Sequence, residues 1–432
     1  MGGEWPLMTL GQAGVTLIDC DHRTPAAVSA GYPYVAIPQI KAGRIDVSDA
    51  RKITREDYLQ WTRKARPYEH DVVLSRRCNP GETAVVPSGL EFALGQNLVL
   101  LRADGDRVHP PFLRWLVRGP EWWRQIGRHL NVGAVFDSLK CADIPVFELT
   151  IPPISDQRAI AHILGSLDDK IELNRRMNET LEEIARALFK SWFVDFDPVR
   201  AKAEGRDTGL PSHIADLFPG SFEESELGEI PAGYGTGTLA DFASLNPESW
   251  SSSSRPAHVE YLDLSNTKWG RIEATVDYAA EDAPSRAQRV LRSGDTIVGT
   301  VRPGNGSYAL IDRDGLTGST GFAVLRPKRV CCTEFVYLAA TAMENIESLS
   351  RLADGGAYPA VRPDVVVATP TVCPDDAVLE CFSRVVGPLL MKMGQGEGES
   401  RVMAAIRDAL LPRLISGELR VPDAEKLSEV AL

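Results

Sequence analysis

The chain has 432 residues and a formal net charge of −12, from 47 basic and 59 acidic side chains. Seven cysteines without any Cys-x-x-Cys spacing argue against a disulfide framework or a zinc ribbon. The absence of a leader-like start and of a long apolar run predicts a cytoplasmic protein rather than a secreted or membrane-spanning one. At face value the acidity also argues against a nucleic-acid binder.

Residues 1–150 are predicted to form a first mixed domain. The apolar runs Val72–Leu74 and Leu98–Leu101 are typical of strands because Gly, Pro, Asn and Asp bound them. The stretch Pro111–Gly127 is predicted to be helical. Within it, Trp122 and Trp123 fit an aromatic core at helical spacing better than base stacking.

Residues 151–197 are predicted to form a central helix. Ser155 or Asp156 can cap it, and no proline interrupts it before Phe193. Its apolar positions repeat at alternating spacings of four and three, which predicts a coiled-coil seam. Asn174 and Asn178 are polar positions in the middle of that seam. We interpret them either as a polar layer that sets the helix register or as a solvated defect.

The end of the central helix is rich in aromatic residues. Phe189, Trp192, Phe193 and Phe196 are too many aromatic side chains for a solvated helix end. They are predicted either to seal the junction between the helix and a globular domain or to dock a partner subunit.

Residues 198–234 are predicted to be a linker, 235–373 a second domain, 374–419 a second helical region and 420–432 a tail. The second domain contains the strand-like runs Thr296–Val298 and Phe322–Leu325, followed by a helical stretch at Glu334–Leu352. The second helical region contains Gly387-Pro388 and Gly394–Glu399, so we expect a kink or break there.

The two domains repeat the same features in the same order. Six matched motifs are displaced by 221–227 residues, among them Gly43-Arg-Ile-Asp46 with Gly270-Arg-Ile-Glu273 and Asp71–Ser75 with Asp295–Gly299. We interpret the chain as a tandem duplication of one globular domain followed by one long helix.

Familiar catalytic and metal-binding patterns are missing from the sequence. The seven histidines form no His-x-His or HExxH pair, so no metal site is predicted. The sequence has no phosphate-binding GxxxxGK and no GxGxxG that opens a helix, and Thr317–Gly321 lacks the first glycine of a nucleophile elbow. With no catalytic residues to name, the chain is predicted not to be catalytic alone.

Three blocks of the sequence resemble the specificity subunits of type I restriction–modification systems. The first conserved region is matched by Ile151-Pro-Pro-Ile-Ser-Asp-Gln-Arg-Ala-Ile160, Leu167–Asn174 and Leu188–Pro198, and the second by Ile406–Leu419. Asp295–Pro303, Thr320–Pro327 and Gly356–Val361 are similar to segments of the family's target recognition domains. The resemblance covers nearly the whole chain.

The resemblance implies an α+β fold with two tandem target recognition domains separated by two long helices, which pack as an antiparallel coiled coil. Each domain would read one half of a split site in double-stranded DNA. The helices would hold two modification (methyltransferase) subunits, and restriction (nuclease-translocase) subunits would join them. S-adenosylmethionine, ATP and Mg²⁺ would belong to these partners, with no cofactor in this chain.

Loops that present Arg and Asn at matching places are the candidate DNA-binding sites, because these side chains contact phosphates and base edges. The predicted DNA-binding residues are Arg76, Arg77, Asn79 and Lys140 in the first domain and Arg302, Asn305 and Tyr358 in the second. A core position is the alternative interpretation of Tyr358.

Two other classes of function stay open at this point. A coiled-coil assembly protein without DNA recognition would explain the helices but not two repeated domains. An enzyme with an unrecognised nuclease or hydrolase site would need metal or nucleophile spacings that the sequence does not show.

Overall fold

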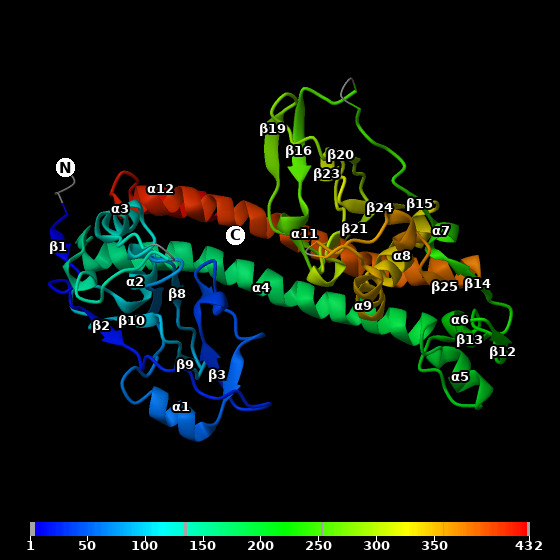
Figure 1. Ribbon diagram of the computed structural model, residues 1–432, viewed down its shortest axis with the longest axis horizontal. Helices are drawn as coiled ribbons and strands as arrows, with labels where there is room; N and C mark the ends of the chain where they lie inside the picture. Colours follow the sequence, from blue (N-terminus) through cyan, green and yellow to red (C-terminus); the bar gives the residue numbers. More distant parts are fainter. Residues whose placement is uncertain (1–4, 134–135, 252–253, 357, 430–432) are drawn as a thin grey trace. The chain divides into compact units, whose positions relative to one another are not determined.

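The computed structural model describes residues 5–133, 136–251, 254–356 and 358–429, and it divides into two units. The first unit comprises Met1–Leu173 and Glu399–Leu432, and the second comprises Asn174–Gly398. Each unit contains one mixed domain together with part of two 40-residue helices, α4 (Ile154–Phe193) and α11 (Asp376–Ile415). The α+β class predicted from the sequence is confirmed (Figure 1).

The first domain is built on a four-stranded antiparallel sheet. Its order is β2 (Val15–Asp19), β10 (Leu98–Ala103), β7 (Val72–Ser75) and β8 (Thr83–Val85). Both faces of the sheet are covered, so β7 and β10 are apolar at successive positions and not only at alternate ones. Val72 and Leu74 face the cluster that contains Phe112 of α2, whereas Val73 faces the cluster around Phe92.

Smaller elements complete the first unit. A second sheet contains β6 (Arg51–Ile53), β3 (Tyr32–Val35) and β9 (Ala93–Leu94), and β1 (Leu7–Thr9) pairs with β11 (Glu148–Thr150). The hairpin β4 (Ile40–Lys41) and β5 (Arg44–Ile45) stands apart from these sheets. The helices are α1 (Arg55–Trp61), α2 (Pro110–Leu116), α3 (Pro120–His129) and α12 (Val421–Glu429).

The second domain has the same core sheet with an enlarged second sheet. The core order is β15 (Ala243–Leu245), β24 (Phe322–Pro327), β21 (Thr296–Gly299) and β22 (Tyr308–Leu310). The second sheet contains β19 (Val276–Ala279), β16 (His258–Leu262), β23 (Leu316–Ser319) and β20 (Ala287–Val290). The other elements are the hairpin β17 (Thr267–Lys268) and β18 (Arg271–Ile272), the pair β14 (Gly235–Thr238) and β25 (Pro370–Cys373), and the helices α7 (Leu239–Phe242), α8 (Thr333–Ala340), α9 (Met343–Leu352) and α10 (Pro363–Val367).

The repeat predicted from the sequence is confirmed by the sheet topology. The strand order β2-β10-β7-β8 of the first domain returns as β15-β24-β21-β22 in the second. The parallel pair β3–β9 returns as the parallel pair β16–β23. An identical sequence of antiparallel and parallel pairings would not arise from a chance string of short strands.

Each domain also contacts the central helix through the same hairpin. Both hairpins turn on two residues with positive φ, Ala42-Gly43 and Trp269-Gly270, as a type I′ turn requires. The following arginine reaches α4 in its own unit. Arg44 forms an ion pair with Glu172 and donates to the Asp168 carbonyl at 2.8 Å, while Arg271 pairs with Glu179 at 3.1 Å. The Gly-Arg-Ile motif therefore positions each domain on the helix.

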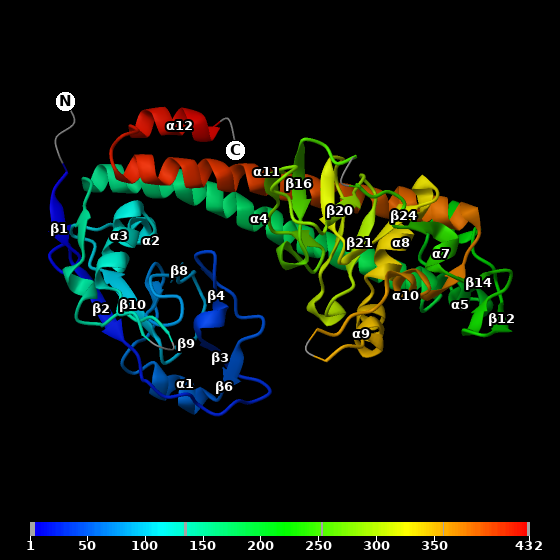
Figure 2. The same ribbon diagram turned by 45° about the horizontal axis from the view of Figure 1, so that its top comes forward.

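Within each unit, α4 lies side by side with α11 and runs antiparallel to it (Figure 2). In the first unit Arg407 of α11 pairs with Asp168 of α4 at 2.6 Å, and Arg114 of α2 joins the same carboxylate at 3.3 Å. Among the described helices, none has the length and apolar character that crossing a membrane requires.

The expected break in the second helical region is wrong. Residues Asp376–Ile415 form one helix that continues through Pro388 and the glycines from Gly394 to Gly398. Burial of Leu390, Met403 and Leu414 outweighs the local cost of proline and glycine, because most helix stability in proteins comes from packing. Gly396 has a packing reason of its own, since a Cβ there would lie 2.9 Å from Asn178 Oδ1.

The segment predicted as a linker is folded. Residues 198–234 contain most of α5 (Asp197–Ala203), α6 (Ser212–Ala215) and a hairpin of β12 (Phe222–Ser225) and β13 (Gly228–Pro231). Val199, Phe218 and Ile230 are buried in the core of the second unit. Scattered apolar residues anchor this segment despite its Gly-, Pro- and acid-rich composition. The predicted tail likewise contains α12, whose Ala424 is buried.

Candidate nucleic-acid interface

The first candidate surface is the loop after β7. Arg77, Asn79 and Lys140 are exposed, as a DNA-binding role requires. Cys78 lies between Arg77 and Asn79, and its left-handed φ of 64° turns the loop sharply. Arg76 is different because its side chain is half-buried and donates to the Leu139 carbonyl at 3.2 Å. Arg76 therefore holds the loop against the 138–140 segment, and a direct DNA contact from it stays a prediction.

The same loop brings together residues that are about sixty positions apart in the sequence. The main chain of Arg77 bridges to Ser138, and the Leu139 N–H donates to the Arg76 carbonyl at 2.9 Å. The Arg77 guanidinium lies 5.4 Å from the centre of the Phe136 ring, which is the range of a cation–π contact. The Phe136 side chain is 44% exposed, so the ring faces solvent beside the arginine.

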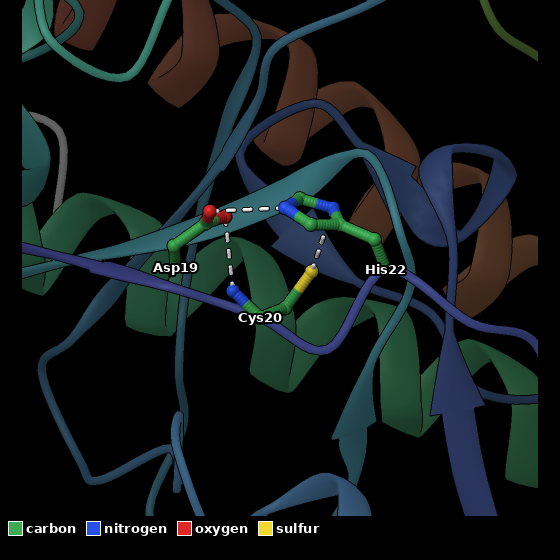
Figure 3. A group of neighbouring side chains, drawn as sticks. All are labelled: Asp19, Cys20 and His22. Atoms are coloured by element: carbon green, nitrogen blue, oxygen red, sulfur yellow. Dashed lines mark hydrogen bonds and ion pairs between the residues drawn. The ribbon is translucent and has the colours of Figure 1, made fainter.

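Asp19, Cys20 and His22 form a hydrogen-bonded cluster at the end of β2 (Figure 3). Asp19 Oδ2 accepts from His22 Nε2 at 3.0 Å, and Asp19 Oδ1 accepts from the Cys20 N–H at 3.0 Å. His22 Nδ1 lies 2.9 Å from the Gln96 carbonyl, and the Cys20 thiol donates to Gly95. Burial first, and then the Asp19 charge, raises the pKa of the Cys20 thiol to about 12.

The sequence patterns did not predict that Asp19, Cys20 and His22 lie together, although these are metal-ligand types within 4.8 Å of one another. Each of the three has protein hydrogen-bond partners, and Cys20 is held as a neutral thiol rather than as the thiolate that binds metals. The main-chain N–H of Arg76 donates to the carbonyl of Asn97, the residue after Gln96. Asp19, Cys20 and His22 therefore help to hold the main chain from which the candidate loop begins.

The second candidate surface is the loop after β21. Arg302 has a left-handed φ of 47°, and its N–H donates to the Pro359 carbonyl at 2.7 Å. Asn305 is exposed and its N–H donates to the Arg302 carbonyl at 2.9 Å. Gly306 closes this turn at φ 66°, where a Cβ would lie 2.5 Å from the Trp269 ring. Only glycine fits this position, so the turn that presents Arg302 and Asn305 is tightly specified.

The structure also brings together Arg302 and Tyr358, which were predicted separately. The Arg302 guanidinium lies 4.7 Å from the centre of the Tyr358 ring, and Tyr358 is 72% exposed. The alternative that Tyr358 is a core residue is therefore wrong. The segment that contains Tyr358 is joined to the loop by the bridge between Val301 and Ala360.

Two exposed residues of these surfaces were missed by sequence reasoning. Phe136 and Arg362 occupy the places that Tyr358 and Lys140 occupy in the other domain, each at a displacement of 222 residues. Aligning the two domains at a displacement of 222 residues would have identified both of them, because this displacement also aligns Gly133 with Gly355. Part of that turn, at Ala134 and at Ala357, lies outside the described residues.

The two candidate register residues face α11 in the second unit. Asn174 Nδ2 donates to the Gly396 carbonyl at 3.3 Å, and Asn178 Nδ2 donates to the Met393 carbonyl at 3.1 Å. Both side chains are buried. This geometry contradicts the interpretation as a solvated defect and agrees with a polar layer between the helices. Whether the layer sets the register stays a prediction.

The candidate docking aromatics are covered by the chain's own residues. Phe189, Trp192 and Phe193 are at most 7% exposed. Phe193 packs edge-on against Phe335 of α8 and Phe382 of α11, with ring centres 5.0 and 4.9 Å apart. These rings seal the helix to the second domain, so the docking interpretation is not kept. Trp122 is likewise buried and donates to the Gly81 carbonyl, whereas Trp123 is 43% exposed, contrary to its predicted core position.

Two repeated domains with similar Arg–aromatic surfaces, each packed on long helices, define a class of two-domain α+β proteins. A family model described as the type I restriction modification DNA specificity domain matches residues 23–183. The HindI specificity subunit of Haemophilus influenzae is 24% identical over 378 residues, which are 76% of this chain and 81% of that protein. The MjaIX specificity subunit of Methanocaldococcus jannaschii is 24% identical over 372 residues, 82% of this chain and 78% of the relative.

A solved structure shares the fold. The S subunit of a type I restriction–modification system from M. genitalium matches with a TM-score of 0.55 at 16% identity, and the match covers 95% of this chain and 96% of that one. Over most of its length the chain is therefore similar to specificity subunits of type I restriction–modification systems.

Proposed function

We propose that the chain is the non-catalytic, sequence-recognising subunit of a type I restriction–modification enzyme, and that its two domains each read one half of a split site in double-stranded DNA. The observation that carries this proposal is the recurrence of one surface in both domains. In each, an exposed arginine lies over an exposed aromatic ring, and a polar loop residue stands beside it. Arginine and asparagine supply the donors that read base edges.

The long helices fit the proposed scaffold for partner subunits. They expose apolar side chains that a solvated helix does not need, including Leu173 and Ile184 on α4 and Met391 and Val402 on α11. We propose that two modification subunits, and through them restriction subunits, bind this part of the chain in the cytoplasm. S-adenosylmethionine, ATP and Mg²⁺ would act in those partners, because the chain itself is predicted to hold no cofactor and to perform no chemistry.

The test measures binding of the complex of this chain with its modification subunits. Sequencing of methylated sites in a host that carries both genes supplies the cognate target. Arg302→Ala should then cost about 1–3 kcal/mol on that target and much less on random duplex, as expected for an arginine that reads a base. Arg206→Ala is the matched control, because Arg206 is also an exposed arginine but lies outside both candidate surfaces.

Equal losses on cognate and random DNA would remove Arg302 as a specificity residue. If the wild-type complex did not distinguish any duplex from another, the proposed function itself would fail. That second outcome would favour the alternative of an assembly protein without DNA recognition.

A further inference from the structure

The Phe136 ring has no role in the fold that would account for its exposure. It is a large apolar side chain, 44% exposed, on a segment joined to the candidate loop by the Arg77–Ser138 bridge. A neighbouring arginine covers part of it at 5.4 Å, and the rest faces solvent. An isolated exposed phenylalanine would be unremarkable on a protein surface.

The second domain also has an exposed aromatic ring beside an arginine, so the Phe136 ring is not an isolated case. Tyr358 occupies the equivalent place, with Arg302 at 4.7 Å from its ring, although the two aromatic segments differ in sequence around the ring. Both rings are held by main-chain pairing, through Ser138 in one domain and Ala360 in the other. The arginine comes from neighbouring positions of the loop, since Arg77 pairs with Ser138 where Val301, just before Arg302, pairs with Ala360. Both copies nevertheless place an arginine against an exposed aromatic ring.

We infer that Phe136 is a specificity-determining residue for the first half of the DNA target, and that it and Tyr358 form a matched pair, one for each half-site. This inference rests on the proposed function. The ring fixes the direction in which Arg77 extends through a cation–π contact. Its exposed part offers an apolar surface to the bases beside the one that the arginine contacts, where a thymine methyl group or an unstacked base face is complementary to it.

A positioning role in DNA reading predicts a pattern that a purely structural role does not. Removing the Phe136 ring should weaken binding only when the first half-site is intact, because the lost contacts exist only there. Removing the Tyr358 ring should give the mirror pattern with the second half-site. A general loosening of the fold would lower affinity for every duplex alike.

The experiment uses the full chain in complex with its modification subunits and four duplexes: cognate, first half scrambled, second half scrambled and both scrambled. Phe136→Ala should weaken binding to the cognate duplex by about tenfold. It should leave binding to the duplex with a scrambled first half unchanged. Tyr358→Ala serves as the matched variant, and Phe136→Tyr should restore wild-type affinity because it keeps the ring.

Two further variants separate the parts of the inference. Phe136→Leu keeps apolar bulk without the ring, so it should retain part of the affinity. Arg77→Ala should cost less in the Phe136→Ala background than alone, because the two side chains act together. The inference is overturned if Phe136→Ala binds the cognate duplex as the wild type does, or if it loses affinity equally on all four duplexes. The proposed function fails separately, if the wild-type complex does not discriminate among the four.

Discussion

Arg326 donates to both carboxylate oxygens of Asp295, and 224 residues earlier Arg102 does the same to Asp71. The Nε–Oδ1 distance is 2.8 Å in both pairs, and the Nη2–Oδ2 distances are 2.8 and 2.6 Å. Each aspartate also accepts the main-chain N–H of the residue three positions before it, Arg292 or Tyr68, at 2.8 Å. Both copies of the domain have therefore kept a buried carboxylate with all of its partners.

Removing this carboxylate should destabilise its domain strongly. In Asp295→Ala, the half-buried Arg326 loses its bidentate partner and keeps its ion pair with Glu248, while the Arg292 N–H loses its acceptor. Breaking a buried pair by removing one partner costs about 3 kcal/mol or more, so the free energy of unfolding in urea should fall by that order. The side chain of Asp295 is only 1% exposed, so water cannot replace it easily.

Glu204→Ala is the control for this measurement. Glu204 pairs with Arg206, but both side chains are more than half exposed, and such pairs contribute less than about 1 kcal/mol. A loss for Asp295→Ala no larger than for Glu204→Ala would show that the duplicated pair does not stabilise the domain.

The close approach of α4 and α11 at Gly396 gives a second prediction. Alanine normally stabilises a helix relative to glycine by about 1 kcal/mol. At Gly396 the new Cβ would lie 2.9 Å from Asn178 Oδ1, so Gly396→Ala should give no such gain or should lower the melting temperature. In an Asn178→Ala background the obstacle is gone, and the same substitution should become stabilising.

Gly165→Ala provides the matched control, because the nearest atom to its Cβ would be Arg114 Nη2 at 3.8 Å. Gly165→Ala should raise the free energy of unfolding by close to the about 1 kcal/mol by which alanine stabilises a helix relative to glycine. A Gly396→Ala variant as stable as Gly165→Ala would mean that the two helices are not held together tightly at the polar layer. The related variant Asn174→Leu with Asn178→Leu tests register directly, since an unchanged register and oligomeric state would refute that role.

The central helix, the core strands and the repeat could be predicted from the sequence, and the residues show why. The central helix was predicted over residues 151–197 because its apolar seam is periodic and free of proline, and α4 covers Ile154–Phe193. The core strands were recognisable because both faces of their sheets are buried, which makes β7, β10, β21 and β24 continuous apolar runs. The repeat then indicated that the second domain would have the same fold as the first.

What the sequence did not disclose depends on contacts between distant residues. The continuity of α11 through Pro388 follows from its packing, which a rule about proline in isolation does not include. The folding of residues 198–234 depends on Phe218 meeting Trp192, whose ring centre lies 5.0 Å away. Phe136 has no periodic neighbours, so only the comparison with Tyr358 marks it.

Cys78 offers a chemical probe of the first candidate surface. It is exposed between Arg77 and Asn79, whereas Cys20 is buried with a pKa raised to about 12. Since the thiolate is the reactive form, iodoacetamide at pH 8 should label Cys78 quickly and Cys20 very slowly. Cognate DNA should protect Cys78 in the assembled complex, as measured by mass spectrometry of the labelled peptides.

Cys331 is the internal control for the footprint, because it is partly exposed and lies outside both candidate surfaces. Its labelling should not change with DNA. Unprotected Cys78, in a complex that demonstrably binds its target, would place the DNA away from the loop after β7.

Charge is distributed unevenly along the chain. The net charge of −12 averages over a basic segment from Arg51 to Lys140, with 15 basic and 10 acidic residues, and an acidic segment from Thr150 to Ile230, with 9 and 16. Because the field near DNA depends on the local charges, Lys140 and its counterpart Arg362 can act as phosphate contacts despite the overall acidity. The isolated chain should still bind DNA weakly, and the complex with its partners strongly.

Lys140→Ala and Arg362→Ala should each weaken binding of the complex by a similar factor on cognate and random duplex. Each should also reduce the slope of log K against log salt concentration by about 1, because one phosphate contact and its released counterion are lost. Arg362 forms an ion pair with the exposed Asp364, a contact too weak to hold the guanidinium away from DNA. A loss restricted to the cognate duplex would instead make these residues base contacts, and tight binding by the isolated chain at physiological salt would contradict the dependence on partners.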